Sequence, residues 1–334
     1  MKATGNRPRC LFARVVAPAP YLWRYMAKRP HKTSIDLIVR RPIASSALLL
    51  LLFCMVFIGC ERDKKLKSVH FLRKGMEEHL KGNVDQAIAD FSKAIELNPQ
   101  DAKGYHMRGV AWHQKRDLDK AISDLTKAIQ MDPGDALAYY NRGVVWNDKG
   151  GFDEAIEDYT QYIKLYPDSP GGYYNRGCAW EKKGDLDRAI ADYTQAIKMK
   201  SNVFDFYYNR GIAFYKKREF DQTFSDFTKA VEIRPEDANA LSYLALILAA
   251  SPTDNHRDGK RAVQLALNAV TRDANYFTLG ALAAAYAENG KFEDAISTQE
   301  QAISLLVKQG KKEELIKYRE CLRFYRAGKP WREK

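Results

Sequence analysis

The sequence predicts an all-α fold in which antiparallel pairs of helices repeat along the chain. Three observations support this prediction. Five successive segments share one spacing of 34 residues and begin at residues 68, 102, 136, 170 and 204. Small residues recur at two fixed positions in each segment, and aromatic residues recur at others. Capping residues, proline and glycine stand where the helices of such a unit would begin and end.

The recurrent small residues indicate where two helices approach each other closely. Glycine inside a helix costs about 1 kcal/mol relative to alanine, so its recurrence at one position needs a reason. A close helix–helix contact supplies that reason, because a larger side chain would hold the two helices apart. Position 8 is always glycine and position 20 is always small: Gly75, Gly109, Gly143, Gly177 and Gly211, then Ala87, Ala121, Ala155, Ala189 and Thr223.

Helix ends are marked by residues that cap free backbone groups. Asp101, Asp135 and Asp237 stand just before the first helix of a unit, where a carboxylate accepts hydrogen bonds from free N–H groups. Pro170 suits a first helical position. The turn between the two helices of a unit carries glycine, which suits a left-handed residue, at Gly82, Gly150, Gly184 and Gly290; arginine replaces it at Arg116 and Arg218.

The aromatic positions complete the pattern. Position 4 holds Phe71, Tyr105, Tyr139, Tyr173 and Tyr207. With the 34-residue period, this pattern resembles the tetratricopeptide repeat, a helix–turn–helix unit. Two divergent units starting at 238 and 276 continue the array, with an insertion at 251–259. We therefore predict seven repeats over 68–309, and a capping helix with a tail over 310–334. The resemblance implies a right-handed superhelical solenoid.

The positive charge of the chain lies in its N-terminal part. The formal net charge is +12, from 54 basic and 42 acidic residues. Residues 1–59 hold ten basic residues and one acidic residue, which leaves 44 against 41, a net charge of +3, for the remainder. A nearly neutral surface releases few counterions on binding a polyanion, so we expect no nucleic-acid partner for the repeats.

Residues 1–59 have the layout of a leader. An apolar segment, 43–59, follows Arg40 and Arg41 and ends at Gly59-Cys60. This order of basic flank, apolar run and small residue is typical of a secretory signal. Residues 57–60 resemble the lipobox of bacterial lipoproteins, which implies lipidation of Cys60, although Phe57 departs from the usual residue of that family. The alternative is a signal anchor that is not cleaved.

Both interpretations attach the chain to a membrane. The basic residues before the apolar segment favour a repeat domain outside the cytoplasm, in a bacterial cell envelope on the periplasmic side. Residues 60–67 are expected to be a linker between the anchor and the repeats. The start of translation is either Met1 or Met26.

The resemblance to tetratricopeptide repeats also implies a ligand-facing groove. In that family the first helix of each repeat (helix A) lines a concave surface, and positions 2, 5, 6, 9, 12 and 13 face the ligand. Tyrosine gives rigid contact area, and asparagine can bond to a peptide backbone. The expected groove residues are His106, Tyr140, Asn141, Tyr174, Asn175, Tyr208 and Asn209. The alternative is that these residues are repeat consensus without a dedicated ligand.

A second repeated pattern predicts ion pairs inside the hairpins. Position 7 faces the second helix of each repeat (helix B), and position 23 lies on that helix. Arginine recurs at position 7 and aspartate at position 23. We therefore expect the pairs Arg108–Asp124, Arg142–Asp158, Arg176–Asp192 and Arg210–Asp226.

The sequence favours a scaffold that binds protein or peptide segments and argues against an enzyme. It contains no nucleophile elbow, phosphate-binding loop or HExxH pattern. We expect no metal site, because no Cys, Asp or Glu at a suitable spacing completes a ligand set with His106 and His113. We also expect no cofactor and no small-molecule substrate. Cys178 and Cys321 are expected to be free thiols. The alternative function is a structural tether or self-associating spacer of the envelope.

Overall fold

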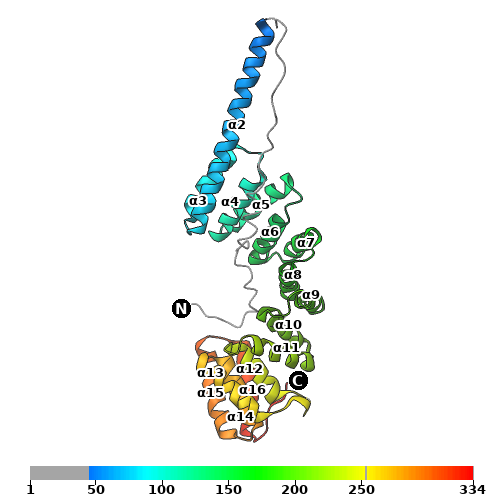
Figure 1. Cartoon of the computed structure of the whole chain (residues 1–334). Helices are drawn as coiled ribbons and strands as arrows, with labels where there is room; N and C mark the ends of the chain where they lie inside the picture. Colours follow the sequence, from blue (N-terminus) through cyan, green and yellow to red (C-terminus); the bar gives the residue numbers. More distant parts are fainter. Residues whose placement is uncertain (1–44, 253, 334) are drawn as a thin grey trace. The chain divides into compact units, whose positions relative to one another are not determined.

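The computed structural model describes residues 45–252 and 254–333, with side chains from Glu61 onward (Figure 1). Regular structure within these ranges is entirely helical, which confirms the predicted all-α class. Consecutive helices pair as antiparallel hairpins, and each hairpin packs against the next within its unit. The chain divides into two compact units, whose described parts are residues 45–167 and 168–333.

The described part of the first unit contains three hairpins, each formed by two successive helices. The hairpins contain α2 (Ser45–Leu80) with α3 (Val84–Leu97), α4 (Ala102–Gln114) with α5 (Leu118–Met131), and α6 (Ala136–Lys149) with α7 (Phe152–Leu165).

Four hairpins and a final helix make up the described residues of the second unit. The pairs are α8 (Pro170–Lys183) with α9 (Leu186–Met199), α10 (Phe204–Lys217) with α11 (Phe220–Ile233), α12 (Ala238–Ala250) with α13 (Gly259–Arg272), and α14 (Tyr276–Glu288) with α15 (Phe292–Lys308). The 3-10 turn η2 (Asp254–His256) lies in the insertion, and α16 (Lys312–Arg326) packs against α15.

Helices start at the residues from which the repeats were counted, with one difference. Helix A begins at 102, 136, 170, 204, 238 and 276. The first repeat has no such start, because α2 runs through residue 68 without a break. Residues 60–67, which we expected to be a linker, are helical. The sequence between Cys60 and Ser68 contains neither glycine nor proline, so nothing in it stops the helix.

The helix ends have the expected chemistry. The carboxylates of Asp101, Asp135 and Asp237 accept hydrogen bonds from backbone N–H groups of the helices they precede. The turn residues have positive φ angles: Gly82 (+84°), Gly150 (+89°), Gly184 (+90°), Gly290 (+75°), Arg116 (+69°) and Arg218 (+64°). The two arginines occupy a conformation that costs a residue with a Cβ atom roughly 1–2 kcal/mol.

Small residues allow helices A and B to approach as expected. An added Cβ at Gly109 would lie 2.8 Å from Cγ of Leu125, and one at Gly143 would lie 2.9 Å from Cε1 of Tyr159. Ala121 and Ala155 are fully buried beside these contacts. The aromatic and aliphatic side chains of helix B therefore pack directly on the glycine backbone of helix A.

Most of the predicted leader, residues 1–59, lies outside what the structure describes. Residues 1–44 are not described, and neither are the side chains of residues 45–60, so the lipidation of Cys60 stays a prediction. Among the residues whose side chains are described, no helix combines the length and apolar character needed to cross a membrane.

Candidate functional site

The predicted arginine–aspartate pairs form in the four hairpins. Arg142 donates from Nε to Oδ2 of Asp158 (2.9 Å) and from Nη2 to Oδ1 (2.7 Å). Arg108, Arg176 and Arg210 make the same two-pronged contact with their aspartates. These pairs hold helix A against helix B, and the expectation of structural pairs is confirmed.

A third nitrogen of the arginine also reaches the preceding hairpin. Nη1 of Arg142 donates to the hydroxyl of Thr126 (3.0 Å), and Nη1 of Arg210 donates to that of Thr194 (3.0 Å). Burial raises the pKa of Asp158 and of Asp226, although the paired arginine acts in the opposite direction. Arg142 and Arg210 therefore each stabilise both a hairpin and its junction with the preceding one.

His106 lies at the centre of a hydrogen-bonded group in the first unit. Its Nδ1 lies 2.7 Å from Oδ2 of Asp135, and its Nε2 lies 2.8 Å from Nδ2 of Asn141. Because the amide nitrogen of Asn141 can only donate, Nε2 accepts and the ring proton lies on Nδ1, facing Asp135. His106 is only 4% exposed, so its ring is held inside the structure, where it bonds to both Asp135 and Asn141.

The carboxylate of Asp135 joins this group to the helix end. It also accepts a hydrogen bond from the backbone N–H of Ala138 (3.2 Å), the cap of α6. Burial acts to raise the pKa of Asp135, but the hydrogen bonds from His106 and from the backbone N–H groups outweigh it. The pKa therefore lies below its ordinary value, and the carboxylate is ionised at neutral pH.

The expected groove residues differ in their accessibility. Tyr140 and Asn141 are partly exposed on α6. Tyr174 is 0% exposed, and its hydroxyl accepts a hydrogen bond from Nδ2 of Asn209 (2.7 Å). Asn175, Tyr208 and Asn209 are buried as well. In this conformation a ligand could therefore reach Tyr140 and Asn141, whereas the other four side chains belong to the packing between repeats.

Four side-chain hydrogen bonds between successive A helices share one spacing that the sequence analysis missed. The paired residues are 35 positions apart, one repeat plus one residue. This spacing reveals a buried carboxylate, Glu181, that accepts from Lys216 Nζ at 2.6 Å and from the hydroxyl of Tyr193 at 2.9 Å. The other pairs are His106–Asn141, His113–Asp148 and Tyr174–Asn209.

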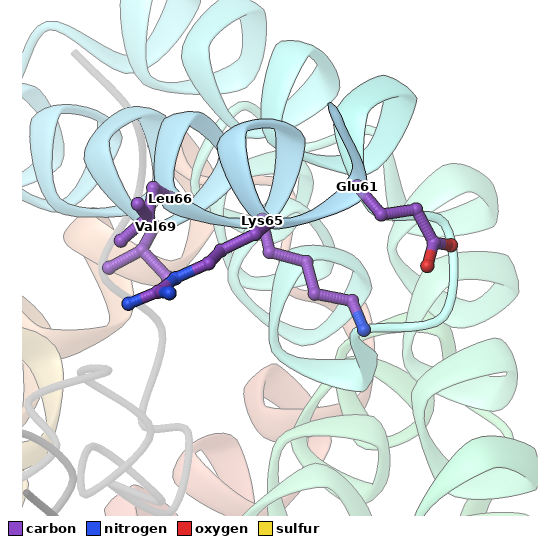
Figure 2. Close-up of a pocket in the computed structure, with 5 residues that line it drawn as sticks. Glu61, Lys65, Leu66 and Val69 are labelled. Atoms are coloured by element: carbon purple, nitrogen blue, oxygen red, sulfur yellow. The ribbon is translucent and has the colours of Figure 1, made fainter. Parts of the chain in front are cut away.

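One surface hollow on the described residues does not resemble a small-molecule site. It is lined by Glu61, Arg62, Lys65, Leu66 and Val69, all on α2, and Figure 2 shows Leu66 and Val69 beside each other on that helix. A site formed by one helix is open to solvent and lacks convergent polar groups.

The described residues contain no cluster of three or more potential metal ligands. Cys178 and Cys321 are buried and no disulfide joins them, and burial raises the pKa of Cys321 to about 12. A thiol with such a pKa is protonated at neutral pH and is a poor nucleophile.

Comparisons with known proteins identify the repeats. Family models described as TPR repeat match residues 75–116 and 181–217, and models described as tetratricopeptide repeat match residues 114–170 and 278–305. No curated protein matches the chain.

Solved structures of low sequence identity share the fold. The structure of pilF from Pseudomonas aeruginosa has 17% identity and a TM-score of 0.54, over 63% of this chain and 93% of that one. A tetratricopeptide repeat protein from Parabacteroides merdae has 15% identity and a TM-score of 0.54, over 76% and 98%. The Cut9–Hcn1 heterotetramer of the APC/C has 19% identity and a TM-score of 0.50, over 72% and 46%. These similarities show a solenoid of helix hairpins.

Proposed function

We propose that this chain is a non-enzymatic scaffold that binds segments of other proteins on the helix-A surface of its repeats. The detected tetratricopeptide repeats support this class of function, because such repeats commonly bind protein segments. The observation that carries the proposal is the placement of Tyr140 and Asn141. Both side chains are partly exposed, and Asn141 is oriented by a hydrogen bond to His106.

A ligand could use these two residues in different ways. The bond to His106 uses one N–H of the Asn141 carboxamide, which also has a second N–H and a carbonyl oxygen for a peptide backbone. The ring of Tyr140 is held by Tyr162, whose centroid lies 5.0 Å away. A fixed aromatic ring beside an oriented amide is a suitable surface for an extended segment, because little entropy is lost on binding.

Site-specific photocrosslinking in the native host tests this proposal. A crosslinking residue in place of Tyr140 should yield discrete crosslinked proteins, and Asn141→Ala should reduce that yield about tenfold, since a lost polar anchor costs about 1.4 kcal/mol or more. The matched control places the crosslinker at Glu157, which is exposed on helix B of the same hairpin. Equal yields of crosslinked protein from the Tyr140 and Glu157 positions would refute binding in the groove. Crosslinks that form only between copies of this chain would favour the self-associating spacer.

We further propose that lipidation of Cys60 anchors the scaffold to the bacterial envelope, with the repeats on the periplasmic side. The support is the sequence of the apolar segment and its boundary at Gly59-Cys60. The intact mass of the membrane-extracted chain should correspond to a diacylated or triacylated chain beginning at Cys60. Cys60→Ser should retain the leader and lose the lipid mass. An unmodified wild-type chain that keeps residues before Cys60 would contradict lipidation and indicate a signal anchor.

A further inference from the structure

Residues 328–333, which we call the return segment, fold back onto the helix-A surface of the second unit. Gly328 has a φ angle of +66° just after α16, and the N–H of Lys329 donates to the carbonyl of Phe324 (3.0 Å). This arrangement is typical of a helix end stabilised by a left-handed glycine. Pro330 prevents the helix from continuing. The chain therefore reverses direction at Gly328.

An aromatic side chain of the return segment fills an apolar pocket. Trp331 is 6% exposed and packs in a cluster with Ala250, Ala287, Cys321 and Tyr325. Small side chains on α12 and α14 give the indole ring its space. The ammonium group of Lys317 on α16 lies 4.8 Å from the ring centroid. The pocket thus recognises an aromatic ring by shape and by an adjacent cation.

Two residues further, a carboxylate is bound by polar groups. The backbone N–H of Glu333 donates to the carbonyl of Ala250 (2.9 Å), which ends α12. Its carboxylate accepts from Lys317 Nζ at 2.8 Å and from the hydroxyl of Tyr215 on α10. Glu333 is only 9% exposed. A buried carboxylate is tolerated because charged and hydroxyl donors surround it.

Arg332, between these two residues, points to a different partner. Its Nη2 lies 2.7 Å from Oε2 of Glu288 on α14, and its Nη1 donates to the carbonyl of Ala249 (3.2 Å). The return segment therefore contacts α10, α12 and α14 through three successive residues. This is the mode in which a groove holds an extended peptide, with backbone bonds for affinity and pockets for side chains.

The contacts fall at the helix-A positions expected to face a ligand. Position 12 of the three repeats holds Tyr215, Ala249 and Ala287. Position 13 holds Ala250 and Glu288. A segment of the chain itself thus occupies a surface suited to a segment of another protein.

The fit of the return segment is incomplete. The indole N–H of Trp331 is buried, and no atom of the described residues accepts its hydrogen bond. A buried donor without an acceptor costs roughly 1–3 kcal/mol. The segment is nevertheless held because it is tethered, since a short linker gives an effective concentration on the order of millimolar. A free segment that binds the same groups could replace it.

We propose that this surface is a binding site for an extended partner segment with a tryptophan followed two residues later by a carboxylate, and that the return segment closes the site in the absence of the partner. The inference adds a second site to the proposed scaffold function. The crosslinking experiment at Tyr140 concerns the first unit only, so either proposal can fail while the other stands.

The test uses the full chain and a fluorescent peptide with the sequence of residues 328–333, Gly-Lys-Pro-Trp-Arg-Glu. A variant with Trp331→Ala and Glu333→Ala frees the site and should bind the peptide at least tenfold more tightly than the wild-type chain, measured by fluorescence anisotropy. Adding Tyr215→Phe, which keeps the ring but removes the hydroxyl donor, should weaken that binding about tenfold. A peptide with the tryptophan replaced by alanine is the matched control and should not bind.

Equal peptide binding by wild type and the freed variant, or no binding by either, would overturn the proposal. Hydrogen exchange on the wild-type chain gives a second measurement that does not depend on the folding of a variant. Millimolar peptide should accelerate exchange of the Glu333 amide, which donates to Ala250, and unchanged exchange would also overturn the proposal. If the wild-type chain formed a dimer and the peptide dissociated it, the occupant of the site would be a second copy of the chain. That result would refute a partner segment as the occupant.

Discussion

Arg142→Ala should lower the free energy of unfolding by about 3–5 kcal/mol, because it leaves a buried carboxylate without its partner. The side chain of Asp158 is 3% exposed and depends on two nitrogens of Arg142. Alanine removes both hydrogen bonds and also the bond to Thr126 that joins α6 to the preceding hairpin. Urea unfolding of the wild type and the variant, followed by circular dichroism, measures the difference.

Two controls separate the buried charge from the loss of any ion pair. Lys149→Ala, on the same helix, removes a pair with Asp119, whose side chain is 82% exposed, and should change stability little. The double variant Arg142→Met with Asp158→Leu removes both charges and should recover most of the lost stability. A small effect of Arg142→Ala, similar to that of Lys149→Ala, would contradict the structural role of the pair.

Gly177→Ala should destabilise the second unit by about 2 kcal/mol, despite the greater helix propensity of alanine. The added Cβ would lie 2.8 Å from Cε1 and 2.9 Å from Cδ1 of Tyr193. The ring cannot move aside easily, since it is fully buried and its hydroxyl donates to Glu181. Helices α8 and α9 would have to separate, and denaturant unfolding would report the cost.

The matched control is Gly171→Ala in the same helix. The nearest atom to its added Cβ is Oγ of Ser169 at 3.8 Å, so the methyl group fits. Alanine there should be neutral, or stabilising by up to about 1 kcal/mol. If the two alanine variants had equal stability, close approach of the helices would not explain the recurring glycine.

The period and local chemistry of the sequence were sufficient to predict the helix starts and the pairs inside hairpins. Gly150 ends a helix and Asp135 caps one through contacts a few residues away, and the Arg142–Asp158 pair lies within one repeat. The sequence of a single repeat is therefore enough to predict these features. The burial of Tyr174 and Asn209 could not be predicted in this way, because it depends on how successive repeats pack. Family consensus gives their position on helix A but not the neighbour that covers them.

Two further differences have physical causes of the same kind. The helix through residues 60–67 continues because nothing in that segment favours a stop, and a charged sequence is compatible with both a helix and a linker. Gly328 and Pro330 signal the end of α16, but the path of the chain afterwards depends on Tyr215, Ala250 and Lys317. Those residues come from three helices that are distant in sequence.

Repeat arrays usually fold as one-dimensional systems, in which each unit is stabilised only by its neighbours and the ends fray first. The hydrogen bond between Tyr215 and Glu333 joins residues 118 positions apart, far more than one repeat. Such a bond closes a large loop, whose entropy must be lost before the contact forms, and this makes it a late event in folding. Once formed, it joins α10 to the segment that follows α16. We therefore expect the C-terminal repeats to open together as one cooperative block, not one repeat at a time.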